Sequence, residues 1–193
     1  MLPGGFRGFH SASLQSNGLK VFPSEAFALN IEYGRIVKDV SVKHFACNNQ
    51  EENRNKVSSN LNERTLREIY LKAFEIAVRE GNAKGIMTSY NRINGVYASN
   101  SHDLCTKILR NEWGFDGVVM TDWFSTSKGR GDNALAMHAG NDLIMPGGGQ
   151  CKKEILNGVK TGRISENDLR RCCANVVKAI FDSATQREYI DTK

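Results

Sequence analysis

The 193-residue chain is poor in proline, has no paired-cysteine motif and contains no long apolar run. With 3 prolines, 40% hydrophobic residues and 24% charged residues, it has the composition of a folded globular protein rather than a disordered or fibrous one. Its 5 cysteines are odd in number and include no Cys-x-x-Cys pair, which argues against a disulfide framework and a zinc knuckle. Because His10, His102 and His138 share no ligand spacing with one another or with the cysteines, we expect no metal and no cofactor.

Positive charge is in slight excess, but the chain has no basic run. The 26 Lys and Arg residues outnumber the 21 Asp and Glu residues by +5 and are interleaved with them, so a nucleic-acid partner is not expected. No stretch approaches the length of a membrane span, and residues 1–7 lack the apolar run of a signal peptide, so no membrane partner is expected. The localisation stays open, and it is cytoplasmic if Met1 is the natural start.

Regular structure is predicted only from about residue 38 onward. Residues 1–37 are rich in glycine and serine and show weak apolar periodicity, so we predict an irregular segment there. The strands are predicted at 40–45, 85–90, 117–122 and 143–146. The helices are predicted from Asn60 or Asn62 to about Ala77, from 101 to 114, at 134–139, at 152–160, and at 166–182 with Ser165 as its cap. The last helix carries an apolar stripe that we expect to be buried: Leu169, Cys172, Val176, Val177 and Ile180.

Strands that are nearly continuous in apolar residues and alternate with helices are typical of a parallel α/β sheet. A closed eightfold barrel of such units takes about 250 residues, and the four units here amount to half of one. In this architecture the chemistry lies at the carboxyl ends of the strands. Polar side chains arrive at three of these ends: Lys43 and His44, Ser89 and Tyr90, and Thr121 and Asp122.

Each of these polar residues has more than one interpretation. Asp122, which follows an apolar strand, suits a helix cap or a loop as well as a catalytic carboxylate. Lys43 suits a sugar clamp, an exposed strand end, or the Schiff-base lysine of a lyase. Tyr90 is either functional or a partly buried residue whose hydroxyl finds a partner. Trp123, beside Asp122, is expected in a pocket, and Arg54 lies in a polar loop that is either solvated or functional.

Seven motifs follow one another in a characteristic order. They are Lys43–Ala46 (KHFA), Asn48–Arg54 (NNQEENR), Glu63–Leu71 (ERTLREIYL), Met87–Asn91 (MTSYN), Glu112–Gly117 (EWGFDG), Met120–Trp123 (MTDW) and Ala139–Pro146 (AGNDLIMP). Together they resemble the second half of the catalytic barrel of family 3 glycoside hydrolases, the family of many β-glucosidases. Any one motif could arise by chance, but the ordered set is highly specific.

The resemblance implies a fold class and a domain division. The fold is α/β, the C-terminal half of a (β/α)8 TIM-like barrel in which parallel strands alternate with helices. Residues 38–185 are then a partial barrel domain of the family, residues 1–37 a segment without a clear family match, and residues 186–193 a tail. Because such a half-barrel exposes unpaired sheet edges, we expect a homodimer or a complementing barrel half as its partner.

The resemblance also implies a reaction and the residues that perform it. The reaction is hydrolysis of terminal β-D-glucosyl, or related β-glycosyl, residues from O-glycosides by a retaining mechanism, with a β-glucoside or oligosaccharide as substrate. In this pattern Asp122 is the nucleophile, and a retaining enzyme places a carboxylic acid on the other side of the sugar, about 5 to 5.5 Å away. The substrate-binding residues are Lys43, His44, Arg54, Tyr90 and Trp123.

The general acid/base is the part of this machinery that the sequence does not supply. In the family it commonly comes from a second domain after the barrel, and this chain ends at Lys193, so we expect the acid/base to be missing. No carboxylate can be assigned that role by motif, although Asp132 and Glu112 are available in loops or at helix ends. The alternative function is therefore a non-catalytic sugar-binding fragment or subunit.

Overall fold

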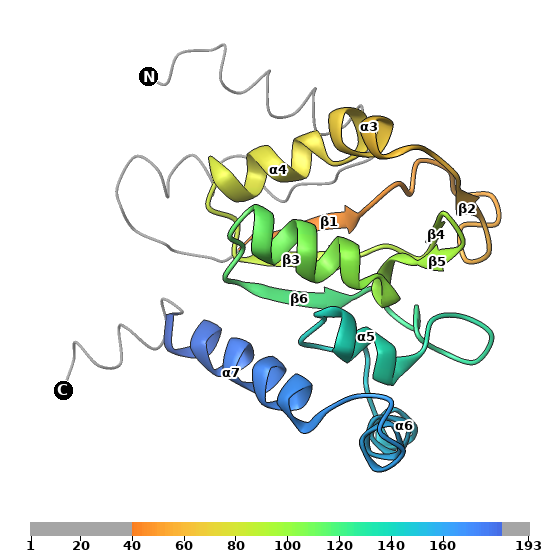
Figure 1. Ribbon diagram of the computed structural model, residues 1–193, viewed down its shortest axis with the longest axis vertical. Helices are drawn as coiled ribbons and strands as arrows, with labels where there is room; N and C mark the ends of the chain where they lie inside the picture. Colours follow the sequence, from red (N-terminus) through yellow and green to blue (C-terminus); the bar gives the residue numbers. More distant parts are fainter. Residues whose placement is uncertain (1–39, 183–193) are drawn as a thin grey trace.

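The computed structural model describes residues 40–182 (Figure 1). Three strands, β1 (Ser41–Phe45), β3 (Gly85–Thr88) and β6 (Val118–Thr121), form a parallel sheet in the order β1-β3-β6. Helices lie between successive strands in the chain, so the predicted α/β class with alternating parallel strands and helices is confirmed. The irregular segment predicted at 1–37 and the tail predicted at 186–193 lie outside the described residues.

Close backbone approach sets the register at the amino end of the sheet. Gly85 pairs with Ser41 and with Val118, and the Val118 amide donates to the carbonyl of Lys84 at 2.9 Å. A Cβ atom at Gly117 would lie 2.1 Å from that same carbonyl oxygen, so only glycine fits where the chain enters β6. With this register, the three strands end at one edge of the sheet, where a barrel-type protein carries its chemistry.

The helical segment after β1 is continuous but not a regular α-helix. It runs through α3 (Glu63–Thr65), a π-helical turn η1 (Leu66–Tyr70) and α4 (Lys72–Arg79). Asn62 caps it, because its Oδ1 accepts the Thr65 amide at 2.8 Å, whereas the Asn60 side chain accepts a bond from Ser58 instead. The predicted helix is therefore confirmed, with Asn62 as its cap.

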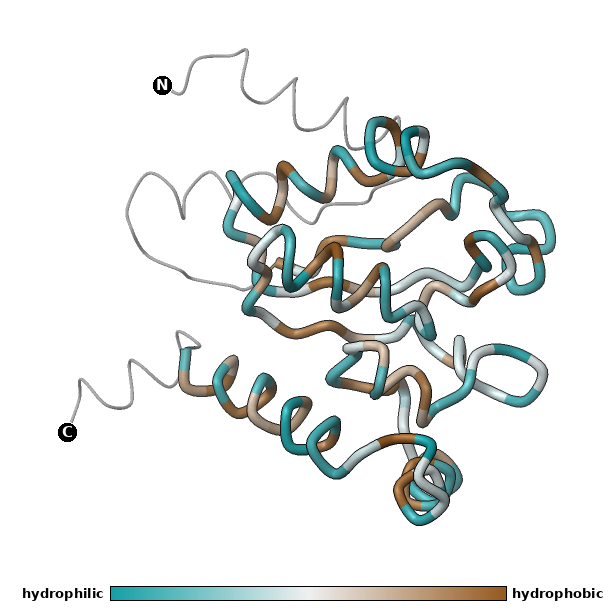
Figure 2. Tube along the Cα trace, viewed as in Figure 1, coloured by the Kyte–Doolittle hydropathy of each residue, from teal (hydrophilic) through white to brown (hydrophobic). Residues whose placement is uncertain are grey.

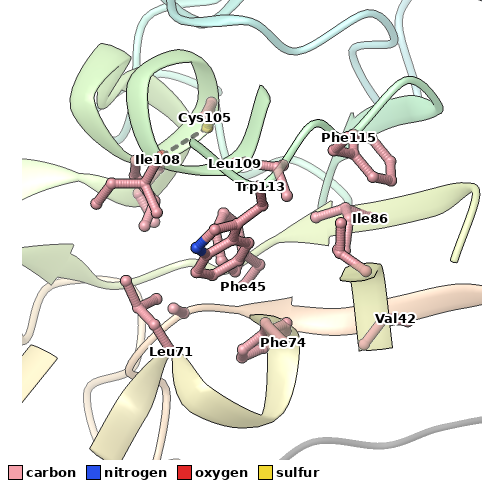
Figure 3. Close-up of a cluster of buried hydrophobic side chains, with 14 of the residues drawn as sticks. Val42, Phe45, Leu71, Phe74, Ile86, Cys105, Ile108, Leu109, Trp113 and Phe115 are labelled. Carbon is pink, nitrogen blue, oxygen red and sulfur yellow. Dashed lines mark hydrogen bonds between the residues drawn. The ribbon is translucent and has the colours of Figure 1, made fainter. Parts of the chain in front are cut away.

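A cluster of buried hydrophobic side chains, which includes several aromatic rings, fills the space between the sheet and the helices (Figure 3). Phe45, at the end of β1, meets Phe74 of α4 edge-on with ring centroids 4.9 Å apart, and Trp113 with centroids 6.0 Å apart. Trp113 follows the π-helical segment η3 (Asp103–Glu112), which occupies the helix position predicted at 101–114. Because all three rings are buried, they fix the end of β1 against both helical segments.

The remaining helices lie at the positions that the sequence predicts. η2 (Ala98–Asn100) precedes η3, and α5 (Asn133–Ala139), α6 (Gly149–Lys160) and α7 (Glu166–Asp182) follow β6, with α4 contacting β1 and α7 contacting β6 (Figure 1). Ser165 caps α7 as predicted, because its Oγ accepts the Asp168 amide at 3.2 Å while the Asp168 carboxylate accepts the Ser165 amide at 3.0 Å.

The predicted burial of the apolar stripe on α7 is wrong for part of the stripe. Cys172 is buried, but Val177 and Ile180 are exposed. Figure 2 shows that hydrophobic and hydrophilic residues are interspersed along this helix, and the exposure of Val177 and Ile180 leaves apolar side chains in solvent. Helical periodicity identifies an apolar face, but it does not say whether another element covers that face. No helix among residues 40–182 has the length and apolar character needed to cross a membrane.

The strand predicted at 143–146 is reduced to one bridge, between Met120 and Leu143. Beyond Leu143 the ladder breaks, because the Met145 amide donates to the Thr121 side chain at 2.9 Å and the Met145 carbonyl accepts from the Phe124 amide at 3.0 Å. A second, small sheet was not predicted: β2 (Ser58–Ser59), β4 (Arg92–Ile93) and β5 (Val96–Tyr97), in the order β2-β4-β5. Strands of two residues carry no readable periodicity.

Candidate active site

Asp122 stands at the carboxyl end of β6 on a rigid support. Its backbone amide donates to the carbonyl of Thr88 at 3.2 Å, so the pairing of β6 with β3 extends to Asp122 itself. Its side chain is about 10% exposed, and Oδ1 accepts the Trp123 amide at 2.7 Å. The second carboxylate oxygen is thus held in a defined direction with a small accessible surface, which suits a group that meets a ligand.

His44 faces Asp122 from the end of β1. Its Nε2 lies 3.4 Å from Asp122 Oδ2. Burial lowers the pKa of His44, and the positive charges of Lys43 and Arg54 lower it further, against the opposing effect of Asp122. The imidazole is therefore mainly neutral at pH 7, with one ring nitrogen available as a donor and the other as an acceptor.

The pairing of β1 with β3 is irregular between Val42 and Phe45, at the position of Lys43 and His44. Irregularities of this kind are common beside active sites, because they redirect side chains at the end of a strand. Lys43 is half-buried here and close enough to His44 for its charge to affect the ring. The structure therefore brings Lys43, His44 and Asp122 to one edge of the sheet, as predicted.

Tyr90 links this edge to the next loop. Its hydroxyl donates to the Trp123 carbonyl at 2.7 Å, and its ring lies under the guanidinium of Arg54, 4.7 Å from the ring centroid. Burial raises the pKa of Tyr90, and the negative charge of Asp122 raises it further. Arg54 is held on its other side by Glu51, with Nη1 2.8 Å from Oε2. Both Tyr90 and Arg54 thus join the cluster around Asp122.

Arg130 is a member of the cluster that sequence reasoning missed. Its guanidinium lies 5.7 Å from the Tyr90 ring centroid, and its Nη1 donates to the Phe124 carbonyl at 3.0 Å. The glycines on either side of Arg130 are the sequence feature that could have identified this turn. Gly129 has a φ of +81°, and a Cβ at Gly131 would lie 2.8 Å from Ser99 Oγ, so both positions favour glycine.

Trp123 and Phe124 form the exposed rim of the site. Trp123 is 51% exposed and Phe124 55%, and their ring centroids are 6.4 Å apart. The Trp123 main chain is fixed at both ends, by Asp122 Oδ1 and by the Tyr90 hydroxyl. Trp123 was expected in a pocket, but the structure places it on the exposed rim beside Asp122, where Phe124 extends the aromatic surface.

The two carboxylates considered for an acid/base role are both engaged elsewhere. Glu112 ends η3 at the amino end of the strands, opposite Asp122, and a hydrogen bond from Arg67 lowers its pKa. Asp132 caps α5, and although burial raises its pKa, Arg163 and backbone amides of the helix hold it below the usual value. A general acid needs a raised pKa, so neither group suits that task.

Among residues 40–182, no three His, Cys, Asp or Glu side chains are grouped so that they could hold a metal ion. The polar groups at this site are the Asp122 carboxylate and, around it, an imidazole, a phenol, an ammonium and two guanidiniums. Hydrogen-bond donors of this kind, next to one fixed carboxylate and an exposed aromatic surface, suit a polyhydroxylated ligand such as a sugar ring.

Comparison with known proteins agrees with this chemistry. The model of the glycosyl hydrolase family 3 N-terminal domain matches residues 33–179. A β-glucosidase of Ruminococcus albus is 43% identical over 151 residues, which cover 74% of this chain and 16% of that protein. An exo-α-(1→6)-L-arabinopyranosidase of Bifidobacterium breve is 41% identical over 140 residues, 72% of this chain and 18% of that protein.

A solved structure of β-glucosidase 3B from Thermotoga neapolitana, in complex with glucose, superposes with a TM-score of 0.70 at 41% identity, over 77% of this chain and 21% of that one. A β-glucosidase from Paenibacillus barengoltzii superposes with a TM-score of 0.72 at 38% identity, over 84% of this chain and 19% of that one. The chain spans about a fifth of the length of the relatives that it matches. With the family model covering most of its length, the chain belongs to glycosyl hydrolase family 3.

Proposed function

We propose that this chain carries the nucleophile of a retaining β-glycosidase that removes terminal β-D-glucosyl, or related β-glycosyl, residues from O-glycosides. One observation carries the proposal: the Asp122 carboxylate is fixed at the end of a buried parallel strand and faces His44 Nε2 at 3.4 Å. Relatives named β-glucosidases support the reaction class. A β-glucoside or an oligosaccharide is the substrate.

In this mechanism Asp122 Oδ2 attacks the anomeric carbon, and a new C–O bond forms as the bond to the leaving group breaks. Water then hydrolyses the glycosyl-enzyme, which releases the sugar with retained configuration and returns Asp122 as a carboxylate. Protonation of the leaving group needs a carboxylic acid on the opposite side of the sugar, and the engaged Asp132 and Glu112 do not suit this role. The machinery within residues 40–182 is therefore the nucleophile half of the site.

The other residues of the cluster bind and orient the sugar. Lys43 and neutral His44 donate hydrogen bonds to its hydroxyls, and bonds that strengthen as charge develops at the anomeric carbon speed the reaction. Tyr90 holds the chain beside the nucleophile through its bond to the Trp123 carbonyl, and Arg54 holds Tyr90 in place. Trp123 provides an apolar wall against the sugar ring.

The same proposal extends to the architecture. Residues 38–185 form the C-terminal half of a TIM-like barrel, flanked by the segment 1–37 and the tail 186–193. Within residues 40–182, β1 pairs only with β3, which leaves its other side open for a further strand. Unpaired strand edges of this kind favour pairing with another chain, so a complementing barrel half or a second copy is the expected partner.

Trapping with 2-deoxy-2-fluoro-β-D-glucosyl fluoride tests the proposal, because fluoride leaves with little acid assistance. Intact-mass spectrometry is expected to show one adduct, which peptide mapping places on Asp122. Asp122→Asn abolishes the adduct, whereas the matched control Asp132→Asn retains it, since asparagine also caps a helix. Ordinary glycosides should react slowly, because leaving-group protonation contributes about 10²- to 10⁴-fold.

Two results would overturn this proposal. An adduct on a residue other than Asp122 would assign the nucleophile elsewhere. Folded protein that binds β-glucosides in both the wild-type and Asp122→Asn forms, with no adduct in either, would leave the non-catalytic sugar-binding function in its place.

A further inference from the structure

We propose that Phe124 is a specificity-determining residue whose ring contacts the leaving group of the substrate and favours a planar aromatic one. The inference rests on the proposed glycosidase function and adds the class of aglycone that the site prefers. It concerns a side chain that takes no part in the cluster of hydrogen bonds around Asp122.

The first argument is the change in exposure along three consecutive residues. Taken over the whole residue, the exposed fraction rises from 7% at Asp122 to 51% at Trp123 and 55% at Phe124. A sugar whose anomeric carbon lies at Asp122 occupies the deep end of this series, so the rest of the substrate extends toward the exposed end. The ring of Phe124, with its centroid 6.4 Å from that of Trp123, lies at this exposed end.

The second argument is the backbone conformation of Phe124. Its φ is +59°, a left-handed conformation that is rare and unfavourable for a bulky side chain. Its amide donates to the Met145 carbonyl at 3.0 Å, and its carbonyl accepts from Arg130 Nη1 at 3.0 Å and from the Ser127 amide at 3.2 Å. Contacts from three directions thus hold an unfavourable conformation that keeps a large apolar ring in solvent.

The third argument is chemical. Phenylalanine offers no hydrogen-bond donor or acceptor, so it gains little from the hydroxyls of a sugar. An aromatic leaving group, by contrast, can stack on or meet the edge of the ring, an interaction that contributes about 0.5–1.5 kcal/mol beyond the buried area. The Phe124 ring, set at 57° to the Trp123 ring that faces the sugar in the proposed function, offers such a face to the aglycone.

Two non-hydrolysable ligands that share the sugar but differ in the aglycone test the inference: phenyl and methyl 1-thio-β-D-glucopyranoside. The full chain is titrated with each, and dissociation constants are measured by NMR or calorimetry. Wild type is expected to bind the phenyl compound about three- to tenfold more tightly. Phe124→Ala should bring the ratio close to one with little change for the methyl compound, and Phe124→Tyr, which keeps a ring, should restore the preference.

Phe181→Ala is the matched control, because Phe181 is equally exposed at 59% but lies on α7, one turn beyond Lys178. Lys178 contacts Asp116, which precedes β6, so Phe181 is at the opposite end of the strand from Asp122. This variant should keep the wild-type ratio. Melting temperatures of all variants show that they fold.

Three results would overturn the inference: equal affinity of wild type for the two compounds, no measurable binding of either, or an equal loss for both in Phe124→Ala. The last result would make Phe124 a residue that positions Asp122 or packs against another segment. The trapping reaction with the glucosyl fluoride involves no aglycone ring, so it fails or succeeds independently of Phe124. A chain that forms the Asp122 adduct without a phenyl preference therefore refutes this inference alone.

Discussion

Removal of the Arg110 guanidinium is expected to destabilise the fold strongly, because it leaves a buried carboxylate without its counterion. The Asp142 side chain is inaccessible to solvent, and its Oδ2 lies 2.6 Å from Arg110 Nη2. The same carboxylate accepts the Val119 amide of β6 and the Asn175 side chain of α7, each at 2.8 Å. This network thus joins η3, β6 and α7 around the strand that carries Asp122.

Breaking a buried ion pair by removing one partner typically costs 3–5 kcal/mol. Because Asp142 keeps two hydrogen-bond donors, we expect Arg110→Met to fall near the low end, at about 3 kcal/mol. A domain of this size has a total stability of about 5–15 kcal/mol, so the loss is large and measurable by urea unfolding. Arg64→Met, which breaks an exposed pair with Glu68, is the control and should cost less than about 0.5 kcal/mol.

The cost of Arg110→Met should also depend on pH. Burial raises the pKa of Asp142 above its usual value, and Arg110 opposes that effect, so its removal raises the pKa further. A carboxyl group with a raised pKa in the folded state binds protons preferentially there, so stability falls as the pH rises from the unfolded-state pKa through the folded-state one. The deficit of the variant is therefore smallest at about pH 4 and largest at neutral pH.

A deficit below about 1 kcal/mol at pH 7, or an equal deficit at both pH values, would refute this reasoning. The double variant Arg110→Met with Asp142→Asn separates charge from packing. Asparagine keeps an oxygen for the Val119 amide but removes the buried charge. We expect it to recover at least half of the lost stability and to remove most of the pH dependence.

Three further changes test the frame and the site. Gly117→Ala should destabilise by about 3 kcal/mol or more in urea unfolding, because its Cβ would lie 2.1 Å from the carbonyl oxygen of Lys84; a cost below 1 kcal/mol would contradict that contact. Tyr90→Phe loses the bond to the Trp123 carbonyl and should slow trapping by the glucosyl fluoride about three- to tenfold with the melting temperature nearly unchanged; an unchanged rate would deny the hydroxyl a role. Asn62→Ala should lower the free energy of unfolding by about 1 kcal/mol in the same urea assay, whereas Asn62→Asp, which keeps a capping oxygen, should leave it nearly unchanged; equal stability of both variants would show that the cap is dispensable.

The sheet could be predicted from the sequence because its signals are local. The apolar runs before Tyr90 and Asp122 are strands, and His44 lies near the end of a third strand; because parallel strands end at one edge, the meeting of these side chains follows from topology alone. The early end of the strand predicted at 143–146 could not be predicted from local signals. Its apolar residues suit a strand, but Thr121 offers a side-chain oxygen in place of a ladder carbonyl, and that substitution is visible only in three dimensions.

Long-range packing also explains why the burial of the apolar stripe on α7 was predicted wrongly. Val177 and Ile180 have the spacing of a buried stripe, yet they are exposed. The spacing records a preference of the helix for an apolar neighbour, and the neighbour is not encoded in the helix itself. Ser165, by contrast, was predictable as a cap because its partner Asp168 lies within the same turn.

The cluster around Tyr90 contains one residue that a sequence motif predicts and one that only the structure reveals. Arg54 and Arg130 are far apart in the sequence, and each reaches the same aromatic ring from a different loop. Arg54 belongs to a motif that resembles the family pattern, whereas Arg130 is placed by the turn that follows Phe124 and by the glycines beside it. Because Arg130 bonds the Phe124 carbonyl while its guanidinium lies over the Tyr90 ring, it links the cluster around Asp122 to the exposed rim. The residues proposed to bind the sugar can therefore be recognised by motif, whereas the residues proposed to lie on the leaving-group side are positioned by loop conformation and are found only in the structure.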